Sequence, residues 1–154
     1  LSKPSHHIRL IKTHHDLTLK FFRHKITAVR LHALRKDLNN YAYYLSLEQT
    51  DLDKAEEMSY RTIKAEPNNA TYLDTYAWIL FIKGNYAEAR IYIDEAMKAE
   101  EGNQSDVVVE HCGDIYYMNG EHEKAIEYWQ KALELGNESE VLKKKIKLKQ
   151  YVQE

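Results

Sequence analysis

The chain has 154 residues, a formal net charge of −2, 44% hydrophobic residues and 30% charged residues. These values fit one globular domain with a packed core. No apolar run approaches the roughly 20 residues that a membrane-spanning helix needs. The single cysteine, Cys112, excludes an internal disulfide framework.

Charge divides the chain into a basic arm and an acidic body. Residues 1–36 carry nine lysines and arginines against one acidic residue, a balance of +8. The remaining residues carry 13 basic and 23 acidic side chains, a balance of −10. Phosphate binding needs a positive surface, so the acidic body argues against nucleic acid as the main ligand.

The arm, residues 1–36, is predicted to be partly helical and partly irregular. Ile26, Val29, Ala33 and Leu34 have helical spacing, which predicts a basic helix that leads into the body. The first 15 residues are expected to be irregular, and the arm could equally be a non-native extension. Adjacent histidines do not share a helix face, so no metal site is expected at His6, His7, His14 and His15.

An internal repeat fills residues 37–136. The small residues Ala42, Ala77 and Gly113 are separated by 35 and 36 positions. A second series of alanines, Ala55, Ala89 and Ala125, is separated by 34 and 36 positions. A period near 34 residues is typical of a two-helix repeat. The predicted units are residues 37–69, 70–104 and 105–136, followed by a capping helix at 137–154.

The residues that favour turns and helix ends agree with this period. Gly84 and Gly120 fall where the second and third units need tight turns, and positive φ costs glycine little. Pro67 is predicted to stop the last helix of the first unit. The lysine run 143–145 in the capping helix is interpreted as a solvated face.

These residues resemble the tetratricopeptide repeat (TPR) family, with "GNY" at 84–86 and the recurring alanines as its signature. The narrower likeness is to the C-terminal repeats of larger bacterial, Bacteroidetes-type TPR proteins, which implies bacterial cytoplasm or periplasm without deciding between them. The family implies an all-α superhelical array of three helix–turn–helix repeats with a C-terminal capping helix. It also implies that the first helix of each pair lines a concave groove.

The groove gives the candidate site. Positions one past each small residue, and one turn on either side, are predicted to face inward: Asn39, Tyr43, Ser46, Asp74, Trp78, Phe81, Glu110, Asp114 and Tyr117. The groove is therefore expected to be aromatic in its middle and acidic toward the third unit, unless Trp78 and Phe81 only pack against neighbouring helices. A basic or amphipathic peptide with apolar anchors suits it. TPR domains that clamp a chaperone's terminal carboxylate use Lys, Arg and Asn there, so Tyr43, Thr71 and Thr75 argue against such a clamp.

No catalytic constellation is found, and no cofactor is expected. Cys112 lies at an apolar helix position and His111 points about 100° away, so a buried thiol is predicted. The predicted function is a non-catalytic protein-interaction module. The alternative is a purely structural terminal segment of a larger TPR scaffold. The arm, with Phe21, Phe22 and Ile26, could also dock into its own groove or that of a second copy.

Overall fold

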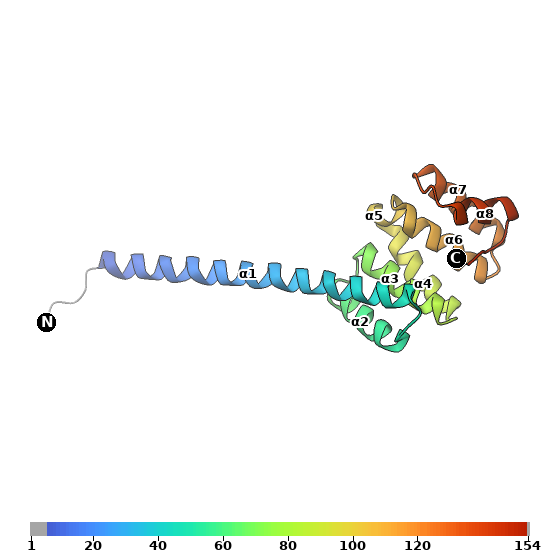
Figure 1. Ribbon diagram of the computed structural model, residues 1–154. Helices are drawn as coiled ribbons and strands as arrows, with labels where there is room; N and C mark the ends of the chain where they lie inside the picture. The colour runs from blue at the N-terminus through green and yellow to red at the C-terminus, as the bar shows by residue number, and fades with distance from the viewer. Residues whose placement is uncertain (1–5, 154) are drawn as a thin grey trace. The chain divides into compact units, whose positions relative to one another are not determined.

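The computed structural model describes the backbone of residues 6–153 and the side chains of residues 25–153. Over the described backbone the chain forms eight helices and no strand, so it is all-α as predicted (Figure 1). The helices are α1 (His6–Leu47), α2 (Leu52–Ala65), α3 (Ala70–Ile82), α4 (Tyr86–Lys98), α5 (Glu100–Asn103), α6 (Asp106–Met118), α7 (His122–Glu134) and α8 (Glu140–Leu148). Two compact units divide the chain, Leu1–Asp37 and Leu38–Glu154.

The first unit contains the beginning of α1. We expected irregular structure in the first 15 residues, but the chain is helical from His6. No glycine or proline lies between Pro4 and the end of α1 at Leu47, so no strong helix breaker opposes propagation of the helix through this stretch. Ile26, Val29 and Leu34 are exposed on this helix. The histidine pairs, with Phe21 and Phe22, lie outside the residues whose side chains are described.

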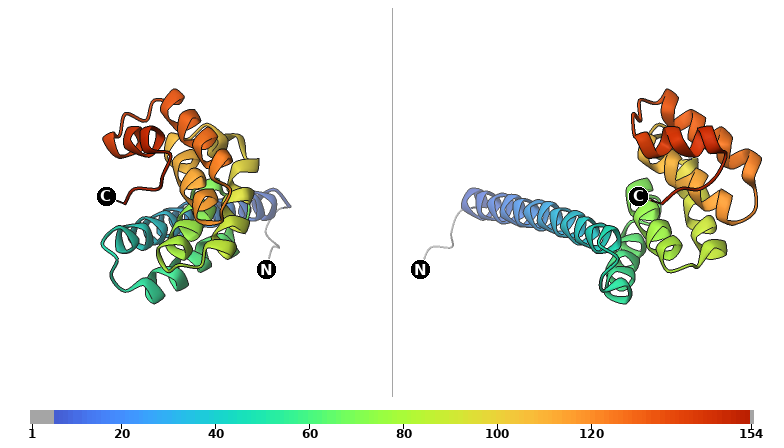
Figure 2. Two further views of the ribbon diagram at one scale, coloured as in Figure 1. Left: turned by 90° about the vertical axis from the view of Figure 1, so that its right-hand side faces the viewer. Right: turned by 45° about the vertical axis from the view of Figure 1, so that its right-hand side comes forward.

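The second unit contains three helical hairpins. The last part of α1 pairs with α2, α3 pairs with α4, and α6 pairs with α7, while α8 packs on α7 (Figure 2). Successive hairpins meet through contacts of α2 with α3 and of α4 with α6. The short helix α5, in the connection between α4 and α6, was not predicted.

The turns within the hairpins differ. Gly84 and Gly120 have φ of +82° and +84°, the left-handed conformation that glycine adopts without a Cβ penalty. The first hairpin has no glycine in its turn and instead places Gln49 and Asp51 at φ of +50° and +46°. The first turn therefore carries backbone strain that the other two avoid.

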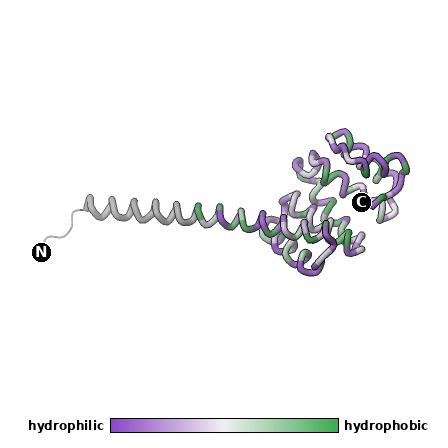
Figure 3. The backbone as a smooth tube through the Cα atoms, viewed as in Figure 1, coloured by the Kyte–Doolittle hydropathy of each residue, from purple (hydrophilic) through white to green (hydrophobic). Residues whose placement is uncertain are grey.

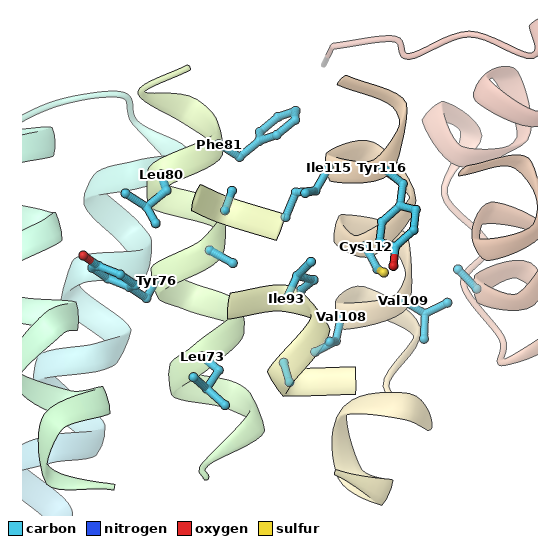
Figure 4. Close-up of a cluster of buried hydrophobic side chains, with 14 of the residues drawn as sticks. Leu73, Tyr76, Leu80, Phe81, Ile93, Val108, Val109, Cys112, Ile115 and Tyr116 are labelled. Carbon is cyan, nitrogen blue, oxygen red and sulfur yellow. The ribbon is translucent and has the colours of Figure 1, made fainter. Parts of the chain in front are cut away.

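Small residues let the helices of each hairpin approach closely. Ala42 and Ala77 are fully buried, as the repeat pattern predicted. A Cβ added to Gly113 would lie 2.5 Å from Cδ1 of Trp129, so only glycine fits where α6 crosses α7. Figure 4 shows the main core, to which α3, α4 and α6 contribute Leu73, Tyr76, Leu80, Phe81, Ile93, Val108, Val109, Cys112, Ile115 and Tyr116.

The described chain alternates hydrophilic and hydrophobic residues at short intervals (Figure 3). Within the described residues, none of the helices combines the length and the apolar character that crossing a bilayer requires.

Candidate functional site

A pocket of about 310 Å³ lies in the second unit, bordered by α1, α3 and α6. These are the first helices of the three hairpins, as predicted for the groove. Five of the residues predicted to face inward line it: Tyr43, Ser46, Trp78, Glu110 and Asp114. We call this pocket and its rim the groove.

The other predicted residues lie behind this lining. Asn39 is buried and its Nδ2 donates a hydrogen bond to Oγ1 of Thr75 at 3.1 Å. Asp74 and Phe81 are also buried, and Tyr117 stacks on Trp129 with ring centroids 5.6 Å apart. Of the four, Asp74 and Phe81 contact the lining residues His111 and Trp78. A direct role in binding for any of the four stays a prediction.

An aromatic stack forms the middle of the groove. The Trp78 ring lies between Phe81 and His111, with centroid separations of 4.8 Å and 4.0 Å and interplanar angles of 13° and 15°. Phe81 is almost fully buried, whereas Trp78 is only partly buried and lines the pocket. Among the described residues, the buried Nε1 of Trp78 has no hydrogen-bond partner. Phe81 therefore supports the stack, and Trp78 presents it to the groove.

His111 joins this stack to a carboxylate. Its Nδ1 lies 2.9 Å from Oδ1 of Asp74, and both side chains are buried. Burial lowers the pKa of His111, but the negative charges of Asp74, Asp114 and Glu110 raise it by more. The net pKa of His111 is therefore above its usual value, which favours an imidazolium that donates to Asp74.

The end of the groove at the third hairpin is a buried charge network. Nζ of Lys145 lies 2.7 Å from Oδ2 of Asp114 and 2.8 Å from Oε1 of Glu110. Trp129 Nε1 donates to Oδ1 of Asp114 at 2.8 Å, and Asn137 Nδ2 donates to Oε2 of Glu110 at 2.7 Å. Burial raises the pKa of Asp114 to about 6, although Lys145 opposes the rise. The acidic end predicted for the groove is therefore largely neutralised from within.

The interpretation of the lysine run as a solvated face is wrong for Lys145. Lys143 and Lys144 are exposed, but Lys145 is 4% exposed and holds the network together. It lies three residues after the fully buried Leu142, on the same face of α8. That spacing was the available signal in the sequence, and the neighbouring lysines obscured it.

The groove also has lining residues from beyond α8. The capping helix was predicted to continue to residue 154, but α8 ends at Leu148. Lys149 has φ of +52°, and Tyr151, Val152 and Gln153 then line the groove without helical structure.

Cys112 packs as a core residue. It is fully buried in the main core, as predicted, and burial raises the pKa of its thiol, so the reactive thiolate is disfavoured. Among the side chains that the structure describes, no group of His, Cys, Asp or Glu is arranged to hold a metal ion.

Comparison with known proteins agrees with this geometry. Residues 110–139, which include α7 and most of α6, match the tetratricopeptide repeat family. Over 85 residues the chain is 34% identical to anaphase-promoting complex subunit 8 of Dictyostelium discoideum, a match that covers 55% of this chain and 14% of that protein. The chain thus spans only a small part of that relative.

Solved TPR domains share the fold. The first TPR domain of human RPAP3 aligns over 75% of this chain and 88% of its own, with a TM-score of 0.66 and 16% identity. The same domain of Spaghetti (RPAP3), bound to the HSP90 peptide SRMEEVD, aligns over 75% of this chain and 89% of its own, with a TM-score of 0.65 and 16% identity. The Sgt2 TPR domain of Aspergillus fumigatus covers 75% of this chain and 76% of its own, with a TM-score of 0.65 and 15% identity.

The chain therefore contains a tetratricopeptide repeat, and its fold is that of a TPR array. The resemblance drawn from the alanine and glycine pattern is confirmed at this level. The narrower resemblance to bacterial TPR proteins stays a prediction.

Proposed function

We propose that the second unit is a non-catalytic protein-interaction module that binds an extended peptide in its groove. The observation that carries this proposal is the partly buried Trp78, stacked between Phe81 and His111 and lining a pocket of about 310 Å³. Because both faces of the Trp78 indole are covered, its edge is the part that meets the groove, and a rigid aromatic edge in a concave site is a suitable anchor point for a partner's apolar side chain. The TPR domain of Spaghetti offers a parallel, since it was solved with a peptide bound.

Apolar side chains at the rim extend this surface. Leu47 on α1 and Val107 on α6 both line the groove and are 53% and 42% exposed. Burying such side chains under a peptide contributes about 25 cal/mol for each Å² of apolar surface removed from water. The rim therefore favours a ligand that brings apolar side chains to both sides of Trp78.

The charges of the groove favour an amphipathic peptide over a strongly basic one. Glu110 and Asp114 already share Lys145, and Asp74 already has His111 as its partner. A basic peptide would have to compete with these internal cations for buried carboxylates. The free energy lost by breaking the internal pairs would exceed the free energy gained from the new ones. Of the two ligand types predicted from the sequence, the amphipathic one is the better match.

The same contacts disfavour a carboxylate clamp. The amide of Asn39 is already committed to Thr75, and Nζ of Lys145 is committed to two carboxylates. A peptide's terminal carboxylate would find no cation among the groove residues that is not already engaged by an acidic side chain. An acidic chaperone tail, such as the HSP90 peptide bound to Spaghetti, is therefore not the proposed ligand.

The test is a selection from a random peptide display library on the intact chain, followed by titration of the selected peptides. We expect peptides with aromatic or aliphatic anchors. Their affinity should fall about tenfold or more in Leu47→Glu and Val107→Glu, because a charge at the rim opposes apolar burial. Ile91→Glu is the matched control, since Ile91 is 62% exposed on α4 and does not line the groove.

The predicted alternative, a purely structural segment, makes the opposite prediction. It would yield no enriched peptide, or peptides that bind all three variants and the unaltered chain equally. Either result would remove the groove as a partner site.

A further inference from the structure

The segment after α8 folds back into the groove. Lys149 adopts the left-handed conformation, which is unfavourable for a residue other than glycine, and redirects the chain. The amide of Gln150 donates to the carbonyl of Lys145 at 3.2 Å, which closes the end of α8. Residues 151–153 then continue without helical structure and line the groove. Contacts made by residues 151–153 hold the segment there.

Tyr151 makes those contacts. Its ring meets Phe81 edge to face at a centroid separation of 5.5 Å, and Phe81 in turn stacks on Trp78. Nζ of Lys145 lies 5.5 Å from the centroid of the same tyrosine ring, within cation–π range. An aromatic side chain, followed by the aliphatic Val152, thus occupies one end of the aromatic stack.

We propose that residues 149–153 act as the groove's own ligand, and that a partner binds by displacing them with an extended segment in which an aromatic residue precedes an aliphatic one. This inference rests on the proposed function. It deepens that function by giving the side-chain pattern of the partner, because the groove already accommodates this pattern from its own chain. It also makes the free groove a minor state, so that the apparent association constant for partners is the intrinsic one multiplied by the small fraction of chains in which the segment is released.

The segment can leave without dismantling the fold. Leu142 is fully buried, and Lys145 anchors α8 to α6 through Glu110 and Asp114, so α8 keeps its place. Tyr151 and Val152 are only partly buried, and they lie beyond the end of the helix. Release therefore exposes part of two apolar side chains.

The experiment uses the full chain and a fluorescent peptide with the sequence of residues 149–154, KQYVQE. A tethered segment acts at an effective concentration on the order of millimolar, so the peptide should compete poorly for the unaltered chain. Tyr151→Ala should release the segment and tighten peptide binding about tenfold or more. Val152→Asp is a second release variant, should Tyr151→Ala lower the melting temperature. Tyr44→Ala is the matched control, because Tyr44 is 55% exposed on α1 and does not line the groove.

A peptide with alanine in place of tyrosine, KQAVQE, should not bind the release variants. Equal binding of KQYVQE to the unaltered chain and to both release variants would overturn the inference, as would equal binding of the two peptides. If a display-selected peptide binds in the groove while the release variants change nothing, this inference fails and the proposed function stands. If neither kind of peptide binds any form of the chain, both fail.

Discussion

The first and third hairpins of the second unit solve the same packing problem in different ways. The first is held by a small apolar cluster of Ala42, Leu45, Ala55, Met58 and Ile79. The third buries Asp114 against Lys145 of α8, while Trp129 donates a hydrogen bond to Asp114 and Asn137 donates one to Glu110. The first turn uses strained residues where the third uses glycine. The family match covers only the third hairpin, which has the glycine, alanine and tryptophan at its helix crossing.

The repeat pattern thus fixes the spacing of the helices, whereas the buried contacts of each repeat differ in kind. A buried charge network loses stability sharply when one member is removed, because the remaining charges stay in a medium that solvates them poorly. A small apolar cluster loses stability in proportion to the atoms removed. Substitutions in the two hairpins should therefore differ in their cost.

The largest effect is expected from Lys145→Met. It leaves Asp114 and Glu110 without their shared cation, and breaking a buried pair in this way costs about 3–5 kcal/mol in the free energy of unfolding. Chemical denaturation measures this cost. Lys143→Met is the control on the same helix, since the pair of Lys143 with Glu140 is exposed and should change little. Adding Asp114→Asn should recover part of the loss, and a cost no greater than that of the control would show that the network is not stabilising.

Gly113→Ala tests the close approach of α6 and α7. The added Cβ would lie 2.5 Å from Cδ1 of Trp129 and 3.1 Å from the backbone oxygen of Ala125, so Trp129 must move away from Asp114. We expect a loss of about 1–3 kcal/mol, measured by thermal or urea unfolding. Gly120→Ala separates crowding from backbone strain, because a Cβ there meets no atom within 4 Å but φ is +84°. A Gly113→Ala variant as stable as the unaltered chain would mean that the crossing tolerates bulk.

His111→Gln tests the link between the charge network and the aromatic stack. The pKa of His111 is raised in the folded state, so its ionic contribution to stability is fully present below the ordinary histidine pKa of about 6.5 and is lost as pH rises through the raised value. The stability advantage of the unaltered chain over His111→Gln should therefore be larger at about pH 6 than at about pH 9. Urea unfolding at both values measures it. His122→Gln is the control, because His122 is exposed and stacks on Tyr117. An advantage that does not change with pH would leave His111 only a packing role.

The smallest effect is expected in the first turn, with Gln49→Gly. Glycine removes the conformational cost of a left-handed residue in the folded state, about 1–2 kcal/mol. It also gives the unfolded chain more conformational entropy, which favours unfolding by about 0.5–1 kcal/mol. The net result should be a stabilisation of about 0.5–1 kcal/mol, seen as a higher melting temperature. Glu48→Gly is the control, because Glu48 lies next to it and is not among the residues with positive φ. If both substitutions destabilise the chain equally, the strain at Gln49 is not significant.

Much of the fold could be predicted from the sequence. The spacing of Ala42, Ala77 and Gly113 located the helix crossings, and Gly84 and Gly120 located two turns, because small side chains and positive φ are local requirements that sequence records directly. The groove could be predicted in outline, since helical geometry projects Tyr43, Trp78 and Glu110 onto one face.

The rest depends on long-range partners. Whether Asp114 is an exposed acid or a buried one is decided by Lys145, 31 residues away, and by Trp129 on the facing helix. The end of α8 was missed because the residues from Lys149 onward lack a glycine or proline to mark it, and because the contact of Tyr151 with Phe81 joins residues far apart in the chain. Such contacts have no local periodicity that a sequence could display.

The most direct test of the groove as a binding site uses the two tryptophans of the chain. Their indole N–H groups give two signals in a ¹H–¹⁵N spectrum. The indole N–H of Trp129 donates a hydrogen bond to Asp114 in the core. The indole N–H of Trp78, in the groove, has no hydrogen-bond partner among the described residues. On titration with a display-selected peptide, the Trp78 signal should shift progressively while that of Trp129 stays nearly constant. A peptide that binds without moving the Trp78 signal would contradict the account, because its site would then lie outside the groove.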